Sequence, residues 1–238
     1  MKETQIELPD ALLAGDASSS SPDFLLLHAG RERRQIWHPV MKRLSAAGLG
    51  CVAYDQRGHG ETLGDHHNDI AVFGSDAAHM LAANGTAKII VGGSLGGFAA
   101  ILALADSDLQ SKMAGLVLVD VVPAPDPERV RRFLSPMMTN PESILFVENI
   151  LAKSDLVLSA AAKLTLPVLL IRAGLDGAIQ DHEVGRLRNL CPQLTVEYIE
   201  NASHLVARDT PIELAKYLLQ FERSDDVRQR KNHLQTTL

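Results

Sequence analysis

The stretch IIVGGSLGGFAA, residues 89–100, decides the fold, because it leads from a β-branched apolar segment through four glycines and one serine into an alanine-rich segment. The apolar residues before the glycines predict a buried strand, and those after them predict a helix. The glycines allow a sharp turn between the two, where flanking Cβ atoms would collide with the strand and the helix. The pattern GxSxG predicts that Ser94 occupies strained backbone on this turn and presents its hydroxyl to a cavity as a nucleophile.

A glycine-rich turn between a strand and a helix has a second interpretation, which is phosphate binding or simple close packing. The segment GGSLGG lacks the lysine of a Walker loop and does not match GxGxxG. The sequence therefore favours a nucleophile and leaves the close-packed turn as the alternative.

Short apolar runs recur along the chain and alternate with longer amphipathic segments, in which apolar residues are three or four positions apart. Runs that are apolar at nearly every position are typical of parallel strands buried on both faces. We therefore expect a mostly parallel central sheet with helices on both of its faces. The six predicted strands cover residues 24–28, 51–55, 87–92, 115–120, 167–172 and 195–200. Residues 4–15 are expected to add an antiparallel hairpin at one edge.

The alternation stops between Pro123 and Leu166, where no strand is predicted. Two stretches in this segment combine a polar capping residue, a proline and apolar helical spacing, which predicts a cap, or lid, of two or three helices. The predicted core domain therefore comprises residues 1–122 and 167–222, with a helical cap insertion at 123–166. Residues 223–238 form a polar C-terminal tail, which we expect to fray because it contains few apolar residues.

Composition excludes several classes of partner. The chain of 238 residues has 23 Lys and Arg against 29 Asp and Glu, a net charge of -6, so no positive field is available for nucleic acid. No apolar run approaches the roughly 18 residues that cross a bilayer, and no membrane association is expected. The two cysteines, Cys51 and Cys191, lack CxxC spacing, and the start MKETQIELPD does not resemble a signal peptide. A cytoplasmic location is the expectation.

A serine nucleophile needs a base and an acid that orients the base. His204 is the candidate base, because it follows the last predicted strand in a loop with small neighbours. Asp176, after the strand at 167–172, is the preferred acid because it gives the chain order Ser, Asp, His. Asp120, at the end of the strand at 115–120, is the alternative acid, and Asp181 is a third candidate.

The same chemistry requires an oxyanion hole. One predicted donor is the backbone N–H of Leu95, directly after the nucleophile. The second is expected from the segment LLLHAGRERRQIW, with the N–H of Gly30 first and that of Arg31 next. His28 in this loop is interpreted as a hydrogen-bonding residue that holds the loop.

Taken together, these motifs resemble those of the α/β-hydrolase superfamily, and the resemblance covers nearly the whole chain. Its parts are HAG (28–30), YDQRGHGET (54–62), GGSLGG (92–97), AGLDG (173–177) and ASHL (202–205). In the second motif, the resemblance implies structural roles for Asp55, Arg57 and His59. The chain departs from the family pattern where Ala29, Ala173 and Ser203 stand in place of glycines.

The resemblance implies a serine hydrolase that cleaves a small carboxyl ester, lactone or thioester through an acyl-serine. Carbon–carbon bond hydrolases, cofactor-free haloperoxidases or perhydrolases, and low-turnover ligand-binding members share these residues and remain alternatives. No cofactor is expected, and GDHHND (64–69) lacks metal-site spacing, so no metal is expected either. The expected partner is a small molecule with an ester-like carbonyl. Candidate pocket residues are Arg31, Phe98, Phe133, Met137, Met138 and Phe146, while Arg33 and Arg34 are interpreted as solvated.

Overall fold

The computed structural model describes residues 1–64, 69–136, 138–175 and 179–236, and its centre is a nine-stranded sheet. The strand order is β1-β2-β4-β3-β6-β7-β8-β9, with β5 paired to β2. In this spatial order, each pair of neighbouring strands from β4 through β3, β6, β7 and β8 to β9 is parallel, which confirms the predicted sheet. The strands are β1 (Lys2–Leu8), β2 (Ala11–Ala17), β3 (Phe24–Leu27), β4 (Cys51–Tyr54), β5 (Leu63–Gly64), β6 (Ile89–Gly93), β7 (Gly115–Val119), β8 (Val168–Ala173) and β9 (Leu194–Ile199).

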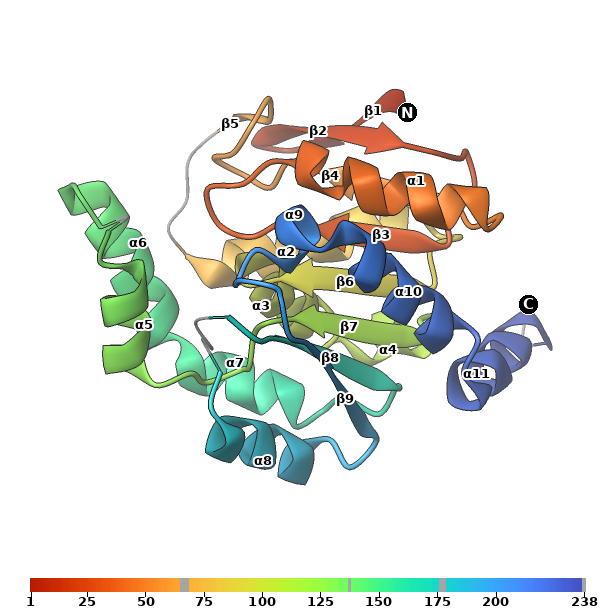
Figure 1. The fold of residues 1–238 in the computed structure, drawn as a ribbon. Helices are drawn as coiled ribbons and strands as arrows, with labels where there is room; N and C mark the ends of the chain where they lie inside the picture. The colour runs from red at the N-terminus through yellow and green to blue at the C-terminus, as the bar shows by residue number, and fades with distance from the viewer. Residues whose placement is uncertain (65–68, 137, 176–178, 237–238) are drawn as a thin grey trace.

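Helices connect the strands and cover both faces of the sheet, as Figure 1 shows. They are the short η1 (Arg34–Trp37), α1 (His38–Ala46), α2 (Ile70–Ala83), α3 (Leu95–Ala103), α4 (Ser107–Ser111), α5 (Pro127–Leu134), α6 (Pro141–Ala152), α7 (Ser154–Ala161), α8 (Asp181–Leu190), α9 (Val206–Asp209), α10 (Pro211–Glu222) and α11 (Asp225–Thr236).

Each central strand feeds two hydrophobic cores, because successive side chains point to opposite faces of the sheet. In β3, Leu25 and Leu27 join one core, while Phe24 and Leu26 join the other. The first core includes buried side chains of α2, α3, α7 and α8, and the second includes those of α1, α9, α10 and α11. This two-sided burial explains why the strands lack a polar alternation in the sequence.

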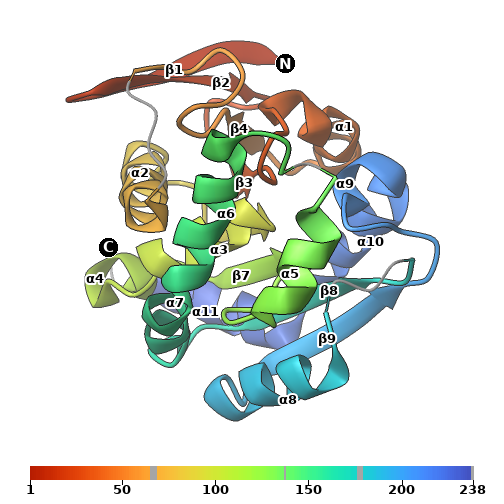
Figure 2. The ribbon, with the colours of Figure 1, turned by 90° about the vertical axis from the view of Figure 1, so that its left-hand side faces the viewer.

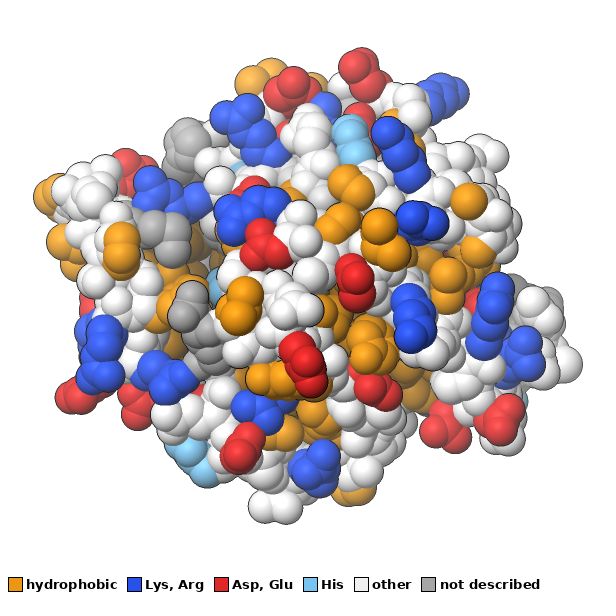
Figure 3. All heavy atoms as spheres, in the orientation of Figure 1, with side chains coloured by type: hydrophobic (Ala, Val, Ile, Leu, Met, Phe, Trp, Pro, Cys, Tyr) orange, Lys and Arg blue, Asp and Glu red, His pale blue; other side chains and the backbone are white. Residues whose placement is uncertain are grey.

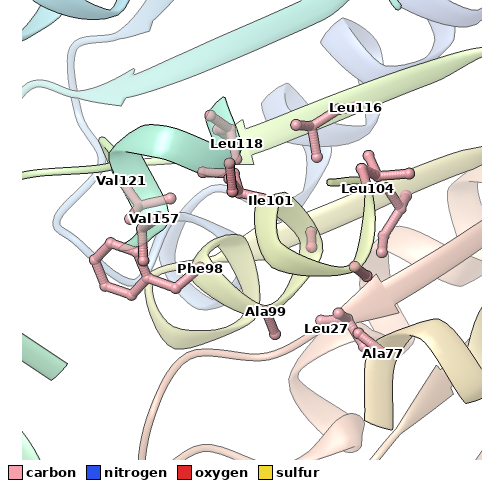
Figure 4. Packing of buried hydrophobic residues seen from close by; sticks show 14 of the residues in the cluster. Leu27, Ala77, Phe98, Ala99, Ile101, Leu104, Leu116, Leu118, Val121 and Val157 are labelled. Carbon is pink, nitrogen blue, oxygen red and sulfur yellow. The ribbon is translucent and has the colours of Figure 1, made fainter. Parts of the chain in front are cut away.

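Helix α3 starts directly after Ser94 and is buried along most of its length. Figure 4 shows Ile101 of α3 and Leu104, the residue after this helix, on the side that faces Leu116 and Leu118 of β7. Phe98, one turn from the start of the helix, lies beside Val121 and Val157. The helix that carries the candidate nucleophile is therefore held by packing on several sides.

The segment predicted to be a helical cap contains α5, α6 and α7. Helix α7 packs on α3, while α5 and α6 stand over the carboxyl ends of the central strands, as Figure 2 shows. Asp126 caps α5 and Asn140 caps α6, each followed by a proline at the first helical position. The capping signals in the sequence thus begin helices where we expected them. The division into a core and a cap domain stays a prediction.

The N-terminal segment agrees with the prediction from the sequence, whereas the C-terminal segment does not. The N-terminal hairpin is confirmed, since β1 and β2 pair antiparallel from Lys2 opposite Ala17 to Leu8 opposite Ala11. The expected frayed tail is instead helix α11. Val227 is fully buried, and the Arg230 guanidinium donates from Nε to the carbonyl of Met113 at 2.6 Å. Val227, the partly buried Leu234 and the partly buried Arg230 therefore dock this polar helix.

Acidic and basic side chains are interspersed on the face shown in Figure 3, in keeping with the modest net charge. Within the part of the chain that the structure describes, none of the helices has the length and apolar character needed to cross a membrane.

Candidate active site

The candidate site lies at the carboxyl ends of the parallel strands, which meet at one edge of the sheet. Ser94 follows β6, Asp120 follows β7, and His204 lies in the loop between β9 and α9. All three line one cavity of about 620 Å³, beneath α5 and α6. The sheet therefore brings together residues that are up to 110 positions apart in the chain.

Ser94 occupies the strained turn that the sequence predicts, with φ 47° and ψ −113°. A Cβ on Gly92 would lie 2.3 Å from the carbonyl oxygen of Gly96, and one on Gly96 would lie 2.4 Å from that of Leu27. Only glycine fits at both positions, because the obstructing atoms belong to the backbone. The carbonyl of Ser94 then accepts the N–H groups of Gly97 and Phe98, which starts α3.

The imidazole of His204 contacts the carboxylate of Asp120. Its Nδ1 lies 2.8 Å from Oδ2 of Asp120, whose side chain is 1% exposed. The second oxygen of Asp120, Oδ1, accepts the backbone N–H of Ala173 on β8 at 3.0 Å. Nδ1 of His204 is thus engaged by Asp120, and Nε2 is the ring nitrogen that remains for other partners in the cavity that His204 lines.

Among the described residues, Asp120 is thus the carboxylate that contacts His204. The sequence named it as the alternative acid. The preferred candidate, Asp176, lies outside the described residues, and the third, Asp181, begins α8 and pairs with Arg172 at 2.7 Å. The end of a buried strand is the sequence signal for Asp120.

The two predicted oxyanion donors are neighbours on the cavity wall. Leu95 is the first residue of α3, where backbone N–H groups have no partner within the helix. A Cβ on Gly30 would lie 3.9 Å from that of Leu95 and 3.7 Å from the ring of Phe146. Gly30 and Leu95 therefore lie close together on the cavity wall, and their role as oxyanion donors stays a prediction.

His28 holds the Gly30 loop, as the sequence suggested. Its Nδ1 donates to the carbonyl of Ala29 at 2.8 Å, and its Nε2 accepts the N–H of Gln56 at 2.9 Å. Burial, followed by the charge of His59, lowers the pKa of His28 to about 4, so the ring is neutral at neutral pH. The neutral ring links the loop after β3 to the loop after β4.

The loop at 54–62 is held by ion pairs, among them those of Asp55 and Arg57. Asp55 accepts the backbone N–H groups of Arg34 at 2.6 Å and Glu61 at 2.9 Å, and also pairs with the Arg34 side chain. Arg57 binds Asp76 through Nε at 2.9 Å and Nη2 at 2.8 Å. These contacts agree with the structural roles inferred for Asp55 and Arg57.

Arg34 differs from expectation, whereas the structural role inferred for His59 stays a prediction. His59 lies on the cavity wall, with its ring centroid 5.1 Å from that of His28. Arg34 was expected to be solvated, yet its side chain is 5% exposed and forms ion pairs with Asp16, Asp55 and Glu61. The three carboxylates come from β2 and from the loop at 54–62, and no local sequence pattern identifies them as its partners.

The cavity wall is mainly apolar and includes most of the predicted pocket residues. These are Arg31, Phe98, Phe133, Met138 and Phe146, while Met137 lies outside the described residues. The ring of Phe133 meets that of His204 edge-on at 5.0 Å, so α5 contacts the candidate base directly. The sequence did not single out the other apolar residues of the wall, among them Val121, Val130, Leu134, Val147, Ile150 and Ile179. A cavity of this size and character fits a small organic molecule.

Among the described residues, no three His, Cys, Asp or Glu side chains are grouped so that they could hold a metal ion. The histidines of GDHHND, His66 and His67, lie outside the described residues.

The sequence of this chain is similar to those of known proteins. Residues 24–217 match the sequence profile of the alpha/beta hydrolase family. A Caenorhabditis elegans protein named "Probable protein phosphatase methylesterase 1" is 30% identical over 156 residues, which cover 60% of this chain. The matched region spans only 43% of that protein.

Solved structures agree on the fold. An esterase of Mycobacterium tuberculosis superposes with a TM-score of 0.73 at 18% identity, covering 94% of this chain and 92% of that chain. An N-formylmaleamic acid deformylase of Pseudomonas putida superposes with a TM-score of 0.71 at 19% identity, covering 92% of this chain and 100% of that chain. At these identities the likeness concerns the fold alone.

Proposed function

Because the chain belongs to the alpha/beta hydrolase family, we propose that it is a serine hydrolase that cleaves a small carboxyl ester, lactone or thioester. The proposed catalytic residues are Ser94 as nucleophile, His204 as general base and Asp120 as the acid that orients it. The single observation that carries the proposal is the 2.8 Å contact between His204 and Asp120 on the wall of the cavity that Ser94 also lines.

In the first half of the proposed reaction, Ser94 Oγ attacks the substrate carbonyl carbon and its proton passes to Nε2 of His204. The Asp120 carboxylate, bound to Nδ1, stabilises the imidazolium that forms. The N–H groups of Leu95 and Gly30 stabilise the negative charge on the former carbonyl oxygen. Collapse of this intermediate breaks the ester bond, and the leaving alcohol takes the proton from Nε2.

In the second half, water attacks the acyl-serine. His204 Nε2 removes a proton from the water, the same N–H groups stabilise the second oxyanion, and Ser94 Oγ leaves with that proton. The products are a carboxylic acid and a regenerated enzyme. Every group in this scheme belongs to the chain, the substrate or water.

The cavity supports a substrate with a sizeable apolar portion. Phe98, Phe133 and Phe146 come from α3, α5 and α6, and each contributes an aromatic ring to the wall. Burying apolar substrate surface there is favourable by about 25 cal/mol per Å². Esters with medium-length acyl chains should therefore be cleaved with higher kcat/KM than acetate esters.

A cytoplasmic location is also part of the proposal and rests on the sequence. Cys51 and Cys191 are buried free thiols, which is typical of proteins kept in a reducing compartment. Fractionation of the native host with an antibody to this chain tests the location.

The decisive experiment for the enzymatic proposal is labelling with a fluorophosphonate, followed by mass spectrometry of the peptide that contains Ser94. Rapid labelling of the wild type and none of Ser94→Ala is the expected result. A panel of p-nitrophenyl esters of increasing acyl length then measures turnover, with Ser94→Ala expected to lose at least about 10,000-fold in kcat. A folded wild type that stays unlabelled would instead favour a ligand-binding member of the family, and survival of activity in Ser94→Ala would refute the acyl-serine.

A further inference from the structure

The loop that carries His204, residues 200–205, is tied to the protein on both sides of the histidine. On the first side, the carbonyl of the buried Ala202 accepts the N–H of Leu175 at 2.8 Å. On the other side, the N–H of Leu205 donates to Ser203 Oγ at 3.3 Å. The position of the imidazole therefore depends on how firmly Ser203 itself is held.

Asp209, at the end of α9, holds Ser203. Its Oδ2 accepts the backbone N–H of Ser203 at 3.2 Å and also accepts the Ser203 hydroxyl. Because the hydroxyl oxygen in turn accepts from Leu205, the Asp209 carboxylate supports the backbone both before and after His204. We call Ser203 and Asp209 together the histidine-loop clamp.

The clamp is charged and continuous with the cavity wall. The other carboxylate oxygen of Asp209, Oδ1, accepts Nε of Arg208 at 2.9 Å, and Arg208 lines the cavity. Burial of the carboxylate acts to raise the pKa of Asp209, but the hydrogen bonds from Ser203 and Arg208 outweigh it, so that pKa lies below its ordinary value. The carboxylate thus stays an acceptor across the working pH range.

Ser203 is also one of the places where this chain departs from the family pattern, which has a glycine before the histidine. A glycine offers no side-chain oxygen and leaves the backbone freer, whereas a serine bound to a carboxylate restricts it. The departure therefore has a chemical consequence, because it creates the link from Asp209 to Leu205 across the histidine.

We propose that Asp209, acting through Ser203, is a positioning residue that holds the His204 imidazole in line between Asp120 and Ser94. This inference rests on the proposed catalytic role of His204. General-base catalysis demands a hydrogen-bond geometry between base and nucleophile, and a misplacement of about 1 Å costs about 100-fold in rate. A clamp that fixes the residues on both sides of the base supplies that geometry.

The test compares Asp209→Ala, Ser203→Ala and the double variant with the wild type, by steady-state kinetics on one p-nitrophenyl ester. Asp209→Ala is expected to lower kcat about 30- to 100-fold and Ser203→Ala about 5- to 10-fold, with KM changed less than about threefold. The double variant should equal Asp209→Ala, because contacts that act as one unit are not additive. Ser203→Thr keeps the hydroxyl and should retain kcat to within about threefold.

Asp106→Ala is the matched control. Asp106 caps α4 by accepting the N–H groups of Asp108 at 2.8 Å and Leu109 at 2.9 Å, and it is not part of the cavity wall. Its loss should lower the melting temperature without changing kcat. A purely structural role for Asp209 would give the same pattern. The side chain of Asp209 is 26% exposed, so Asp209→Ala should fold, and Ser203→Ala removes only one hydroxyl in any case.

The rate of fluorophosphonate labelling separates this inference from the proposed function. Slower labelling of Ser94 in both clamp variants, in proportion to the fall in kcat, supports the clamp, because labelling also requires His204 as base. Wild-type labelling with unchanged kcat in Asp209→Ala would overturn the clamp and leave the hydrolase intact. A wild type that is neither labelled nor active would overturn both.

Discussion

Asp120 and His204 are 84 positions apart in the chain, yet Oδ2 of one lies 2.8 Å from Nδ1 of the other. The contact arises because β7, β8 and β9 are successive neighbours in the sheet and end at the same edge. Asp120 turns back from β7 with φ 49°, a conformation in which its Oδ1 reaches the N–H of Ala173 on β8. The hydrogen bond to β8 therefore sets the position of the Asp120 carboxylate independently of its contact with His204.

This contact predicts which aspartate orients the base. Asp120→Asn should lower kcat about 1,000- to 10,000-fold with little effect on folding, because an amide stabilises neither the tautomer nor the imidazolium. Asp176→Asn is the comparison and should keep kcat within about tenfold of the wild type. Steady-state kinetics on the same ester measures both, and a large loss in Asp176→Asn with normal activity in Asp120→Asn would assign the role to Asp176.

The backbone of Ser94 predicts a stability difference between two inactive variants. A non-glycine residue at φ 47° and ψ −113° stores strain of about 1–3 kcal/mol. Glycine relieves that strain but gains about 0.4–1 kcal/mol of freedom in the unfolded chain. Ser94→Gly should therefore exceed Ser94→Ala by about 1 kcal/mol in free energy of unfolding. Urea titration measures this, and equal midpoints would show that the turn is relaxed.

Two adjacent glycines of the turn that carries Ser94 should respond to the same substitution with very different losses of stability. A Cβ on Gly92 would meet backbone atoms of Gly96 and Gly97 at 2.3–2.5 Å, whereas one on Gly93 would find its nearest neighbour, the Ala29 nitrogen, at 3.9 Å. We expect Gly92→Ala to lose about 3 kcal/mol of stability or to fail to fold, and Gly93→Ala to change by less than about 1 kcal/mol. Similar urea midpoints for the two variants would contradict this packing.

The buried His28 predicts a pH dependence of stability. Its pKa is about 4 in the folded protein against 6.5 in the unfolded chain, so the unfolded chain binds the proton first as pH falls. The stabilisation by neutral His28 is complete above pH 6.5 and is lost as pH falls toward 4, by about 3 kcal/mol in all. Urea unfolding between pH 7.5 and 4.5 should show this loss.

His28→Asn provides the control for that dependence. At pH 7.5 the variant should be less stable by about 1–3 kcal/mol, because the N–H of Gln56 loses its acceptor. Its stability should nevertheless fall less steeply below pH 6.5, since no buried imidazole remains to be protonated. Parallel curves for wild type and variant would show that His28 does not titrate as expected.

The sequence predicted the sheet well because strand burial leaves a strong local signal. Runs such as GLVLVD and PVLLIR are short, apolar and bounded by glycine, proline or aspartate, and they became β7 and β8. The capping residues Asp126 and Asn140 likewise carried local information about α5 and α6. Features that depend only on residues within about ten positions of one another could therefore be predicted from the sequence.

Features that depend on contacts between distant segments of the chain could not be predicted from the sequence. The partner of His204 is set by the order of strands in the sheet, and the ion pairs of Arg34 join residues from β2 and the loop after β4. In the C-terminal segment, Arg230 of α11 donates a hydrogen bond to the carbonyl of Met113, which lies more than a hundred positions earlier in the chain. Long-range contacts of this kind have no local pattern to read.

The ion pairs of Arg34 also change how the start of the chain should be regarded. Asp16 on β2 binds both Arg34 and His38, which lie four and eight residues beyond Gly30. The first hairpin thus braces the segment that follows Gly30. Trimming β1 and β2 would leave a buried guanidinium with one fewer counter-charge, and we expect such a shortened chain to lose catalytic competence before it loses its fold.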